Sequence, residues 1–425
     1  MTTFDRMEPR LPELMDDLAA ARIPDYFDDL LQQTARTRQR PAWSALERWL
    51  PMGTIARPII TLPAPWRPLV LLIALALLLA TAAVAFIGSR PPAIPPPFGL
   101  ARNGLIVIAT EAGDLATVDP ATGTVAGLVT HPASEYAPWL AHDGRRLLFD
   151  RRGTGTAESL FVTGIDGTQT RELLSRPTEI QWFDWSPADD RVAVTYDVDG
   201  RRTVSIIDVA SGAIAPLDLG VEPTGAVYWR PNGRELVLEG IAAADGVVTH
   251  GLYLVGADGT GLRPILPPLV SETEYMAPTL AGDGIHLAYH RWRQPDQLGR
   301  IHVVDIDSGV DRALTGETDA NVNEEVPAYS PDGSLIAFER YSDDVGGGYR
   351  IVVGSSDGTG PFRALGPAHP ALTNGAVVMF SPDGTQLLVN YRADSSTWLF
   401  EIASGGEQRM SWPTKVEATW QRLPT

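Results

Sequence analysis

The sequence YSPDGSLIAFER at residues 329–340 and the sequence FSPDGTQLLVNYR at residues 380–392 contain the same short pattern twice. In each copy an S-P-D-G turn is followed by an apolar strand. Proline presets φ at the second position of such a turn, aspartate tolerates the third, and glycine takes the positive φ that returns the chain. The pattern therefore predicts two antiparallel strands joined by a tight turn.

Weaker copies of the pattern fill most of the chain after residue 100, namely LAHDGRRLLFDRR, WSPADDRVAVTYD, WRPNGRELVLEG and LAGDGIHLAYHR. A second turn, of the type D-G-T or S-G, follows each first turn, and the whole unit repeats every 40 to 51 residues. A four-stranded unit that recurs at this distance is typical of a blade in a β-propeller.

The first unit is incomplete, because residues 101–130 supply three strands but not the innermost one. The chain ends in VEATWQRLPT, where Trp420 takes the place of Trp185 and Trp229 in other units. This last strand can complete the first blade, which removes an open edge. We therefore expect an all-β, seven-bladed propeller of four-stranded blades with split-blade closure. If the last strand does not join, the alternative is six blades with a flanking hairpin.

These motifs resemble those of bacterial TolB-like, WD-repeat-like β-propeller proteins, whose repeat centres on S-P-D-G and an apolar strand. The resemblance covers about residues 101–425, with intact motifs at residues 330–333 and 381–384 and divergent turns in the other copies. It implies the propeller fold. It does not imply one function, because such propellers include scaffolds, sensors and accessory domains of peptidases.

A membrane anchor is expected before the propeller. Residues 69–88, LVLLIALALLLATAAVAFIG, contain no charge, and twenty helical residues span about 30 Å, the thickness of the hydrocarbon core. Six arginines precede this stretch closely and few follow it, so the N-terminus is predicted to be cytoplasmic. The sequence thus predicts a single-pass signal anchor in a bacterial cytoplasmic membrane, with the propeller extracytoplasmic.

Four regions follow from this division. They are a mostly helical cytoplasmic segment at residues 1–67, a transmembrane helix at 68–88, a proline-rich linker at 89–100 and a β-propeller at 101–425. Helical spacing of apolar residues appears at residues 11–23 and 25–39. One alternative is that residues 1–50 hold a cytoplasmic regulator, as in membrane-bound anti-sigma factors. The other is that the segment only sets the topology.

Composition excludes several kinds of site. The chain has no cysteine, which removes disulfides, thiolate nucleophiles and iron–sulfur clusters. Its net charge of −18 argues against nucleic acid as a partner, because binding to phosphates needs a basic surface. Asp-rich stretches at residues 197–200 and 341–348 lack the twelve-residue calcium pattern, so no cofactor is expected and calcium is only an alternative.

The expected binding surface is the propeller face that carries the longer loops, at residues 240–251, 290–299 and 340–348. Residues that enter the innermost strands should surround the mouth of the central channel at that face. Mixed acidic and aromatic side chains there suit a protein or peptide with basic or amide groups, or a cation. The candidates are Glu135, Tyr136, Gln181, Trp182, Tyr275, Glu324 and Glu325.

The candidate catalytic and metal-binding patterns in this sequence each lack a structural feature that their chemistry requires. The G-x-S-x-G string at residues 354–358 covers a turn between strands and has no helix after it, as a nucleophile elbow requires. His286 and His290 lie about 13 Å apart on a strand, too far to share one metal. We therefore expect a non-catalytic binding or scaffolding module. The alternatives are a transmembrane signalling regulator with the propeller as its sensor, and an enzyme with its site at the channel mouth.

Overall fold

The computed structural model describes part of the chain, and every structural statement below concerns that part. The described residues are 67–88, 97–153, 158–176, 179–244, 246–270, 273–293, 298–316, 322–342, 348–369, 376–391, 394–412 and 414–425. The chain divides into two compact units, Met1–Arg90 and Pro91–Thr425. The helices predicted at residues 11–23 and 25–39 lie outside the described residues.

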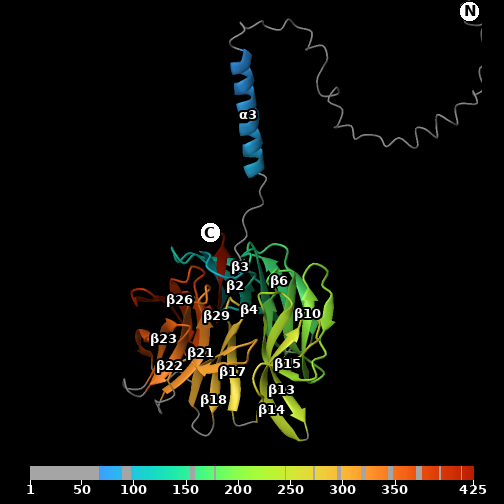
Figure 1. Cartoon of the computed structure of the whole chain (residues 1–425), viewed down its shortest axis with the longest axis vertical. Coiled ribbons are helices and arrows are strands. Elements are labelled where there is room, and N and C mark those ends of the chain that lie inside the picture. Colours follow the sequence, from blue (N-terminus) through green and yellow to red (C-terminus); the bar gives the residue numbers. More distant parts are fainter. Residues whose placement is uncertain are drawn as a thin grey trace, which may run out of the picture. The chain divides into compact units, whose positions relative to one another are not determined.

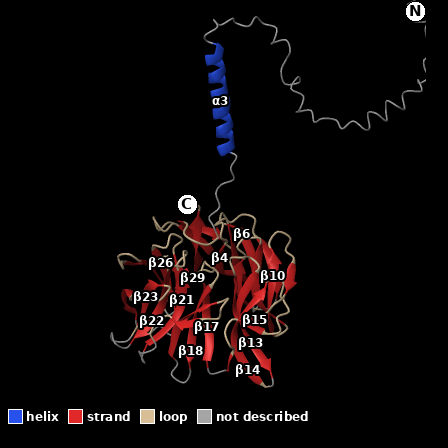
Figure 2. Cartoon of the chain, viewed as in Figure 1, coloured by secondary structure: helices blue, strands red, loops and turns tan. Residues whose placement is uncertain are grey.

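The first unit contains the helix α3 (Arg67–Gly88), drawn in blue in Figures 1 and 2. Leucine and alanine dominate it, Pro68 stands in its first turn, where no backbone N–H is needed, and Gly88 ends it. Its described side chains, at residues 68–78, are all exposed. Within the described part of the chain, no helix has both the length and the apolar character needed to cross a membrane.

The described residues of the second unit form seven antiparallel sheets, which we call blades 1 to 7. Their strands are drawn in red in Figure 2. Blade 1 consists of β29 (Thr414–Leu423), β1 (Arg102–Thr110), β2 (Leu115–Val118) and β3 (Val125–Val129). Blade 2 consists of β4 (Ser134–Leu140), β5 (Arg146–Arg152), β6 (Glu158–Gly164) and β7 (Arg171–Arg176). Blade 3 consists of β8 (Ile180–Trp185), β9 (Arg191–Val198), β10 (Arg201–Asp208) and β11 (Ile214–Pro216).

The other four blades also follow the order of the chain. Blade 4 consists of β12 (Glu222–Trp229), β13 (Glu235–Ala244), β14 (Val247–Gly256), β15 (Arg263–Pro264) and β16 (Leu269–Val270). Blade 5 consists of β17 (Thr273–Leu280), β18 (His286–Arg293), β19 (Leu298–Asp305) and β20 (Asp311–Ala313). Blade 6 consists of β21 (Val322–Tyr329), β22 (Leu335–Ser342), β23 (Tyr349–Ser355) and β24 (Arg363–His369). Blade 7 consists of β25 (Ala376–Phe380), β26 (Gln386–Tyr391), β27 (Ser396–Glu401) and β28 (Glu407–Arg409).

The predicted split closure is confirmed in blade 1. β29 pairs with β1 in an antiparallel register that places Ile106 opposite Trp420 and Val107 opposite Thr419. The indole N–H of Trp420 donates to the carbonyl of Gly104 at 3.2 Å, much as the indole N–H of Trp185 donates to the carbonyl of Trp139 at 3.0 Å. The fold is therefore an all-β propeller with seven blades, and the six-bladed alternative is wrong.

The S-P-D-G turns adopt the geometry that the sequence predicts. In blade 6 the Ser330 hydroxyl donates to Asp332 at 2.6 Å and accepts the N–H of Leu335 at 2.9 Å, so the serine closes the turn from inside. Gly333 has φ of +73°, and in the divergent turn of blade 3 Asp189 takes the same left-handed region at +56°. Aspartate tolerates this region better than most residues, which explains how that turn survives without glycine.

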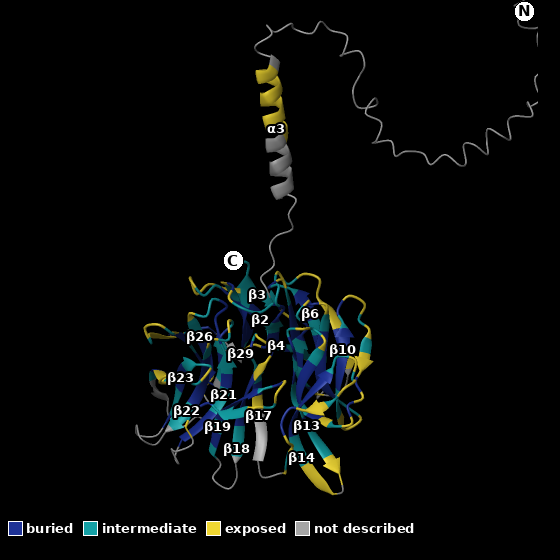
Figure 3. Cartoon of the chain, viewed as in Figure 1, coloured by how far each residue is buried: buried dark blue, intermediate teal, exposed yellow. Residues whose placement is uncertain are grey.

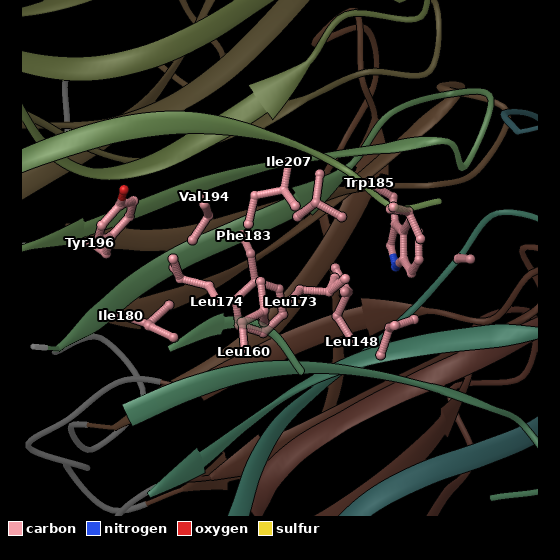
Figure 4. Close-up of a cluster of buried hydrophobic side chains, with 14 residues drawn as sticks. Leu148, Leu160, Leu173, Leu174, Ile180, Phe183, Trp185, Val194, Tyr196 and Ile207 are labelled. Atoms are coloured by element: carbon pink, nitrogen blue, oxygen red, sulfur yellow. The ribbon is translucent and has the colours of Figure 1, made fainter. Parts of the chain in front are cut away.

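The apolar core lies between successive blades. Figure 4 shows one cluster, in which Leu148 and Leu160 of blade 2 pack against Phe183, Val194 and Ile207 of blade 3. Equivalent clusters join blades 3 and 4, 4 and 5, 5 and 6, 6 and 7, 7 and 1, and 1 and 2. Each blade therefore buries both faces, and the ring is held together at every junction.

One expected loop is a strand pair. The sequence predicts a long loop at residues 240–251, but β13 and β14 pair through this region as far as Ala244 opposite Val247. β16 adds to the same extension, with His250 opposite Leu269. The Asp-Gly dipeptide at residues 245–246, between these two strands, is a favoured hairpin turn sequence. Figure 3 shows the end of this hairpin as exposed, and Val247, Val248 and Val270 are 48%, 42% and 60% exposed.

Candidate binding site in the central channel

The innermost strand of each blade borders the propeller axis. β29 contacts β4, β8 contacts β12, β12 contacts β17, β17 contacts β21, β21 contacts β25, and β25 contacts β29. These strands surround a central channel, as in other propellers. Because side chains alternate along a strand, each innermost strand places every second residue on the same side.

One position of the innermost strands is partly exposed in nearly every blade. In blades 2 to 7 it lies two residues before the first residue of the following turn, and in blade 1 Thr419 takes this place, just before Trp420. The residue just before it is buried in all seven blades. At this position all residues but Thr419 are partly exposed. We call the set the channel ring: Trp139, Asp184, Tyr228, Thr279, Ala328, Met379 and Thr419.

The channel ring differs from one side to the other. Blades 2 to 4 contribute Trp139, Asp184 and Tyr228, whereas the other four blades contribute only uncharged residues without rings. Trp182 lies two residues before Asp184 and so on the same side of β8. Its ring lies 6.4 Å from that of Trp139 and 5.4 Å from that of Tyr228, measured between centroids. Three aromatic rings thus form an arc beside the one carboxylate.

The carboxylate of Asp184 also joins two blades. Its Oδ2 accepts the backbone N–H of Trp229 in blade 4 at 2.9 Å. Burial raises the pKa of Asp184 to about 6, although hydrogen bonds from the Trp229 backbone and the Trp139 indole and the nearby His142 act in the opposite direction. A carboxylate with this pKa is ionised at neutral pH and becomes protonated in mild acid.

The two neighbouring aromatic residues remain uncharged donors. Burial raises the pKa of Tyr228 well above its usual value, helped by the charges of Glu239 and Asp184. The indole nitrogen of Trp182 is buried and has no hydrogen-bond partner among the described residues. An aromatic arc with one ionised carboxylate attracts a cation through both ring quadrupoles and charge. The free indole N–H can receive a carbonyl oxygen from the same ligand.

Two of the three glutamates predicted at the channel mouth, Glu135 and Glu324, are buried in ion pairs. Glu135 of β4 is fully buried and accepts the Nε–H of Arg151 in β5 at 3.0 Å. Burial raises the pKa of Glu135 to about 7 in spite of this partner. Glu324 of β21, which is 1% exposed, accepts two hydrogen bonds from Arg340 of β22, at 3.0 and 2.7 Å. These two carboxylates join strands within a blade.

The other predicted site residues lie in separate blades. Tyr136 is partly exposed, with the guanidinium of Arg152 5.4 Å from its ring. Gln181 lies at an irregularity in the pairing of β8 with β9. Glu325 accepts a hydrogen bond from the Asn323 amide. The backbone of Tyr275 pairs with Arg291, and its side chain lies outside the described residues.

The structure brings only Trp182 of the predicted set into the aromatic arc. Trp139, Asp184 and Tyr228 are not among the predicted residues, because the prediction concerns residues that enter the innermost strands and these three leave them. Aligning the blades on their turns would have shown the position, since it holds two large aromatic residues and one acid in consecutive blades. The sequence therefore contains a signal for the aromatic arc, at the position that Trp139, Asp184 and Tyr228 occupy in their blades.

The structure also describes the G-x-S-x-G string and the two histidines that the sequence analysis considered as catalytic or metal-binding patterns. The G-x-S-x-G string begins at the end of β23 and continues into the following turn, and the hydroxyl of its central Ser356 donates to the carbonyl of Gly333 at 2.6 Å. His286 and His290 both belong to β18, and burial lowers the pKa of His290 to about 4. Among the residues that the structure describes, no group of three or more histidines and acids is placed to hold a metal ion.

Comparison with known proteins adds to the description of the fold. No family model matches the sequence, and no curated protein matches it significantly. Oligogalacturonate lyase from Vibrio parahaemolyticus is similar in structure, with a TM-score of 0.55, 14% identity, and coverage of 73% of this chain and 87% of the lyase. The β-propeller domain of the Trilobed protease from Pyrococcus furiosus has a TM-score of 0.52 and 10% identity, over 75% of this chain and 98% of that domain.

TolB from Acinetobacter baumannii also appears among the similar structures, with a TM-score of 0.45 and 16% identity, over 77% of this chain and 82% of TolB. At such identities similarity of structure concerns the fold and not the function. Together with the seven sheets described above, the comparisons identify the second unit as a β-propeller.

Proposed function

We propose that this chain is an anchored binding protein whose propeller holds a cationic group of a protein or peptide in its central channel. The observation that carries the proposal is the position of Asp184, one partly exposed carboxylate beside the rings of Trp139, Trp182 and Tyr228. An arginine or lysine side chain meets both requirements of such a site, a charge and a flat or apolar surface. The module acts without catalysis in this proposal.

The side of the channel that lacks rings supports this function. Thr279, Ala328 and Met379 have small or flexible side chains without charge, so they leave room opposite the aromatic arc and do not compete for Asp184. A cation that enters the channel therefore finds one counter-ion. Recognition then depends on Asp184 for charge and on the three rings for shape.

Binding of a simple probe tests the proposal. N-acetyl-arginine amide is titrated into the full chain while tryptophan emission is followed, because Trp139 and Trp182 border the site. We expect saturable quenching at pH 7.5 and a fall in affinity of tenfold or more in Asp184→Asn. Since the pKa of Asp184 is about 6, affinity should also decrease as the pH falls through 6.

Asp199→Asn serves as a matched control, because Asp199 is exposed in the turn between β9 and β10 and its removal subtracts the same charge. Asparagine also tolerates the φ of +49° at this position. This control should bind the probe as the wild type does. Equal affinity of Asp184→Asn and the wild type would overturn the proposal.

The anchored topology is part of the same proposal. It is supported by the uncharged sequence of residues 69–88, which forms the helix α3, and by the arginines that precede it. In a bacterial host the chain should sediment with the cytoplasmic membrane, and external protease should digest the propeller but leave residues 1–67 protected. Recovery of the intact chain in the soluble fraction would contradict the topology and leave the channel site untouched.

Residues 1–67 can be used as bait to test the signalling alternative. Reproducible recovery of a cytoplasmic regulator would indicate that the propeller acts as a sensor. Its ligand would still be the cation in the channel. Recovery of no regulator would support the alternative that residues 1–67 only set the topology of the chain.

A further inference from the structure

The segment at residues 98–101, which we call the plug, lies across one end of the central channel. The ring of Phe98 lies 5.2 Å from the ring of His142, in the turn between β4 and β5 of blade 2, measured between centroids. A Cβ added to Gly282, in the turn between β17 and β18 of blade 5, would lie 3.4 Å from the Cβ of Phe98. Blades 2 and 5 are three places apart, the greatest separation in a ring of seven. A residue that meets both turns therefore lies over the axis.

Backbone hydrogen bonds fix the plug to three further blades. The N–H of Gly99 donates to the carbonyl of Pro331 in blade 6 at 2.9 Å. The carbonyl of Gly99 accepts an Nη2–H of Arg422 in blade 1 at 2.6 Å. The N–H of Ala101 donates to the carbonyl of Pro382 in blade 7 at 2.9 Å. Together with the contacts to blades 2 and 5, the plug meets five of the seven blades, and all of them at the end that carries the turns after the innermost strands.

The channel ring lies next to the plug. In blades 2 to 7 each ring residue lies two residues before one of these turns. His142, which Phe98 contacts, is close enough to Asp184 for its charge to lower the pKa of that carboxyl. Asp184 is partly exposed, yet burial is the largest influence on its pKa. A side chain that reaches solvent while protein surrounds it lies in an enclosed space, and the plug closes this space at the turn end.

The channel ring offers few acceptors to a cation that carries N–H groups. Asp184 is the only carboxylate among its seven residues, and it already accepts hydrogen bonds from the backbone of Trp229 and the indole of Trp139. The hydroxyl of Thr419 already accepts the N–H of Leu140. A guanidinium has five N–H donors and a primary ammonium has three, and each donor left unpaired in an enclosed site weakens binding. A quaternary ammonium has no N–H donor to satisfy.

From the plug and the channel ring together we infer that the channel ends in an aromatic pocket for a quaternary ammonium group that enters from the loop face. The inference rests on the proposed function, because it narrows the kind of cation that the channel holds. The rings of Trp139, Trp182 and Tyr228 attract the methyl groups over which the charge is spread, and Asp184 supplies the counter-charge. Phe98 closes the turn end with a further ring. Because the plug blocks that end, the group must stand at the end of a small molecule or of a side chain.

Four probes, titrated into the full chain by calorimetry at pH 7.5, test the inference. Choline and N-acetyl-trimethyllysine amide present the same group on a small molecule and on a protein side chain. N-acetyl-arginine amide presents a guanidinium, and 3,3-dimethylbutanol is the neutral isostere of choline. We expect the better quaternary probe to bind about tenfold or more tightly than both the arginine amide and the alcohol. Tighter binding of choline would assign the group to a small molecule, and tighter binding of the trimethyllysine amide would assign it to a protein.

Variants of the plug separate its ring from its bulk. Phe98→Ala removes both and should weaken the better quaternary probe by about tenfold, whereas Phe98→Leu keeps an apolar cover and should weaken it less. Leu100→Ala is the matched control, because Leu100 belongs to the plug but is 47% exposed and lies beside Gly384 in the turn of blade 7. It should bind the probe as the wild type does. Melting curves check that all three variants are folded.

The outcomes separate this inference from the proposed function. If the arginine amide binds as tightly as the better quaternary probe, the inference is overturned while the proposed function stands. The same holds if Phe98→Ala binds the quaternary probe as tightly as the wild type. If none of the three cations binds, both the inference and the proposed function are overturned.

Discussion

Blade 1 and the other six blades have the same architecture, but they differ in which part of the chain supplies the innermost strand. In blades 2 to 7 the four main strands follow one another in the chain, whereas in blade 1 β29 joins β1 from the opposite end. The Leu105 N–H and the side-chain oxygen of Gln421, which bond at 3.1 Å, are 316 residues apart. Strand pairing and inter-blade packing therefore define a blade, and a connecting turn is not required.

Side chains replace the missing turn in blade 1. Gln421 donates to the carbonyl of Gly144 at 2.7 Å, and Thr419 accepts the N–H of Leu140 at 3.3 Å, so β29 is fixed to blade 2 as well. Asn103 accepts the N–H of Asp383, which fixes β1 to the turn of blade 7. We call the pairing of β29 with β1 and these contacts the seam.

Deleting residues 414–425 gives the largest expected effect, because it removes β29 and exposes the edge of β1. Blade 1 would lose the buried Ala418 and Trp420, and blade 2 would lose its neighbour. We expect a loss of more than about 5 kcal/mol, comparable with the whole stability of many domains, and no cooperative unfolding transition. A synthetic peptide of residues 410–425 should restore the transition in part; an unchanged urea midpoint after deletion would show that the seam is dispensable.

Gly144→Ala should disturb the seam directly. A Cβ at Gly144 would lie 2.2 Å from the carbonyl oxygen of Arg422, and the φ of +68° is already unfavourable for alanine. We expect a destabilisation of about 3 kcal/mol, of which about 1 kcal/mol comes from φ. Gly333→Ala is the control, since its φ is +73° and no atom lies within 4 Å of its Cβ. Equal unfolding midpoints for the two variants would contradict the prediction that the close contact at the seam makes Gly144→Ala the more destabilising change.

Glu135→Gln tests the charge beside the seam. The N–H of Glu135 donates to the carbonyl of Gly113 in blade 1 at 2.7 Å, and its pKa is raised to about 7 mainly by burial, with Asp114 adding to the shift. A raised carboxylate pKa favours folding at low pH. Wild-type stability should therefore fall by about 2 kcal/mol relative to Glu135→Gln as the pH rises from 4.5 to 7. Parallel stability curves for the two proteins across this range would contradict the prediction.

Gln421→Ala has the smallest expected effect. It removes the acceptor of the Leu105 N–H and the donor to Gly144, which costs about 1 kcal/mol for partly buried groups. Gln386→Ala is the control, because Gln386 bonds Glu401 at an exposed position and should change stability by less than about 0.5 kcal/mol. Chemical unfolding of both variants measures the difference, and a larger loss in Gln386→Ala would reverse the comparison.

The sequence predicts much of this fold because its turns are chemically explicit. The S-P-D-G motifs and their divergent copies identify the blades, and the place of Trp420 predicts the seam. The hairpin at residues 240–251 was misread as a loop because its alanines and valines show no clear alternation. The channel ring was missed for a different reason: strand order around an axis brings Trp139, Asp184 and Tyr228 together, and no local pattern contains all three.

The seam also bears on how quickly the molecule forms and how long it lasts. Because loop-closure entropy grows with the logarithm of length, joining residues 316 apart costs only about 3 kcal/mol more than closing a ten-residue loop. The search for such a distant partner is nevertheless slow, so β29 should dock after the other blades have formed. Its release should then be the first step of unfolding. The half-life of the folded ring would be a rate set at this one strand, even where its equilibrium stability comes from all seven blades.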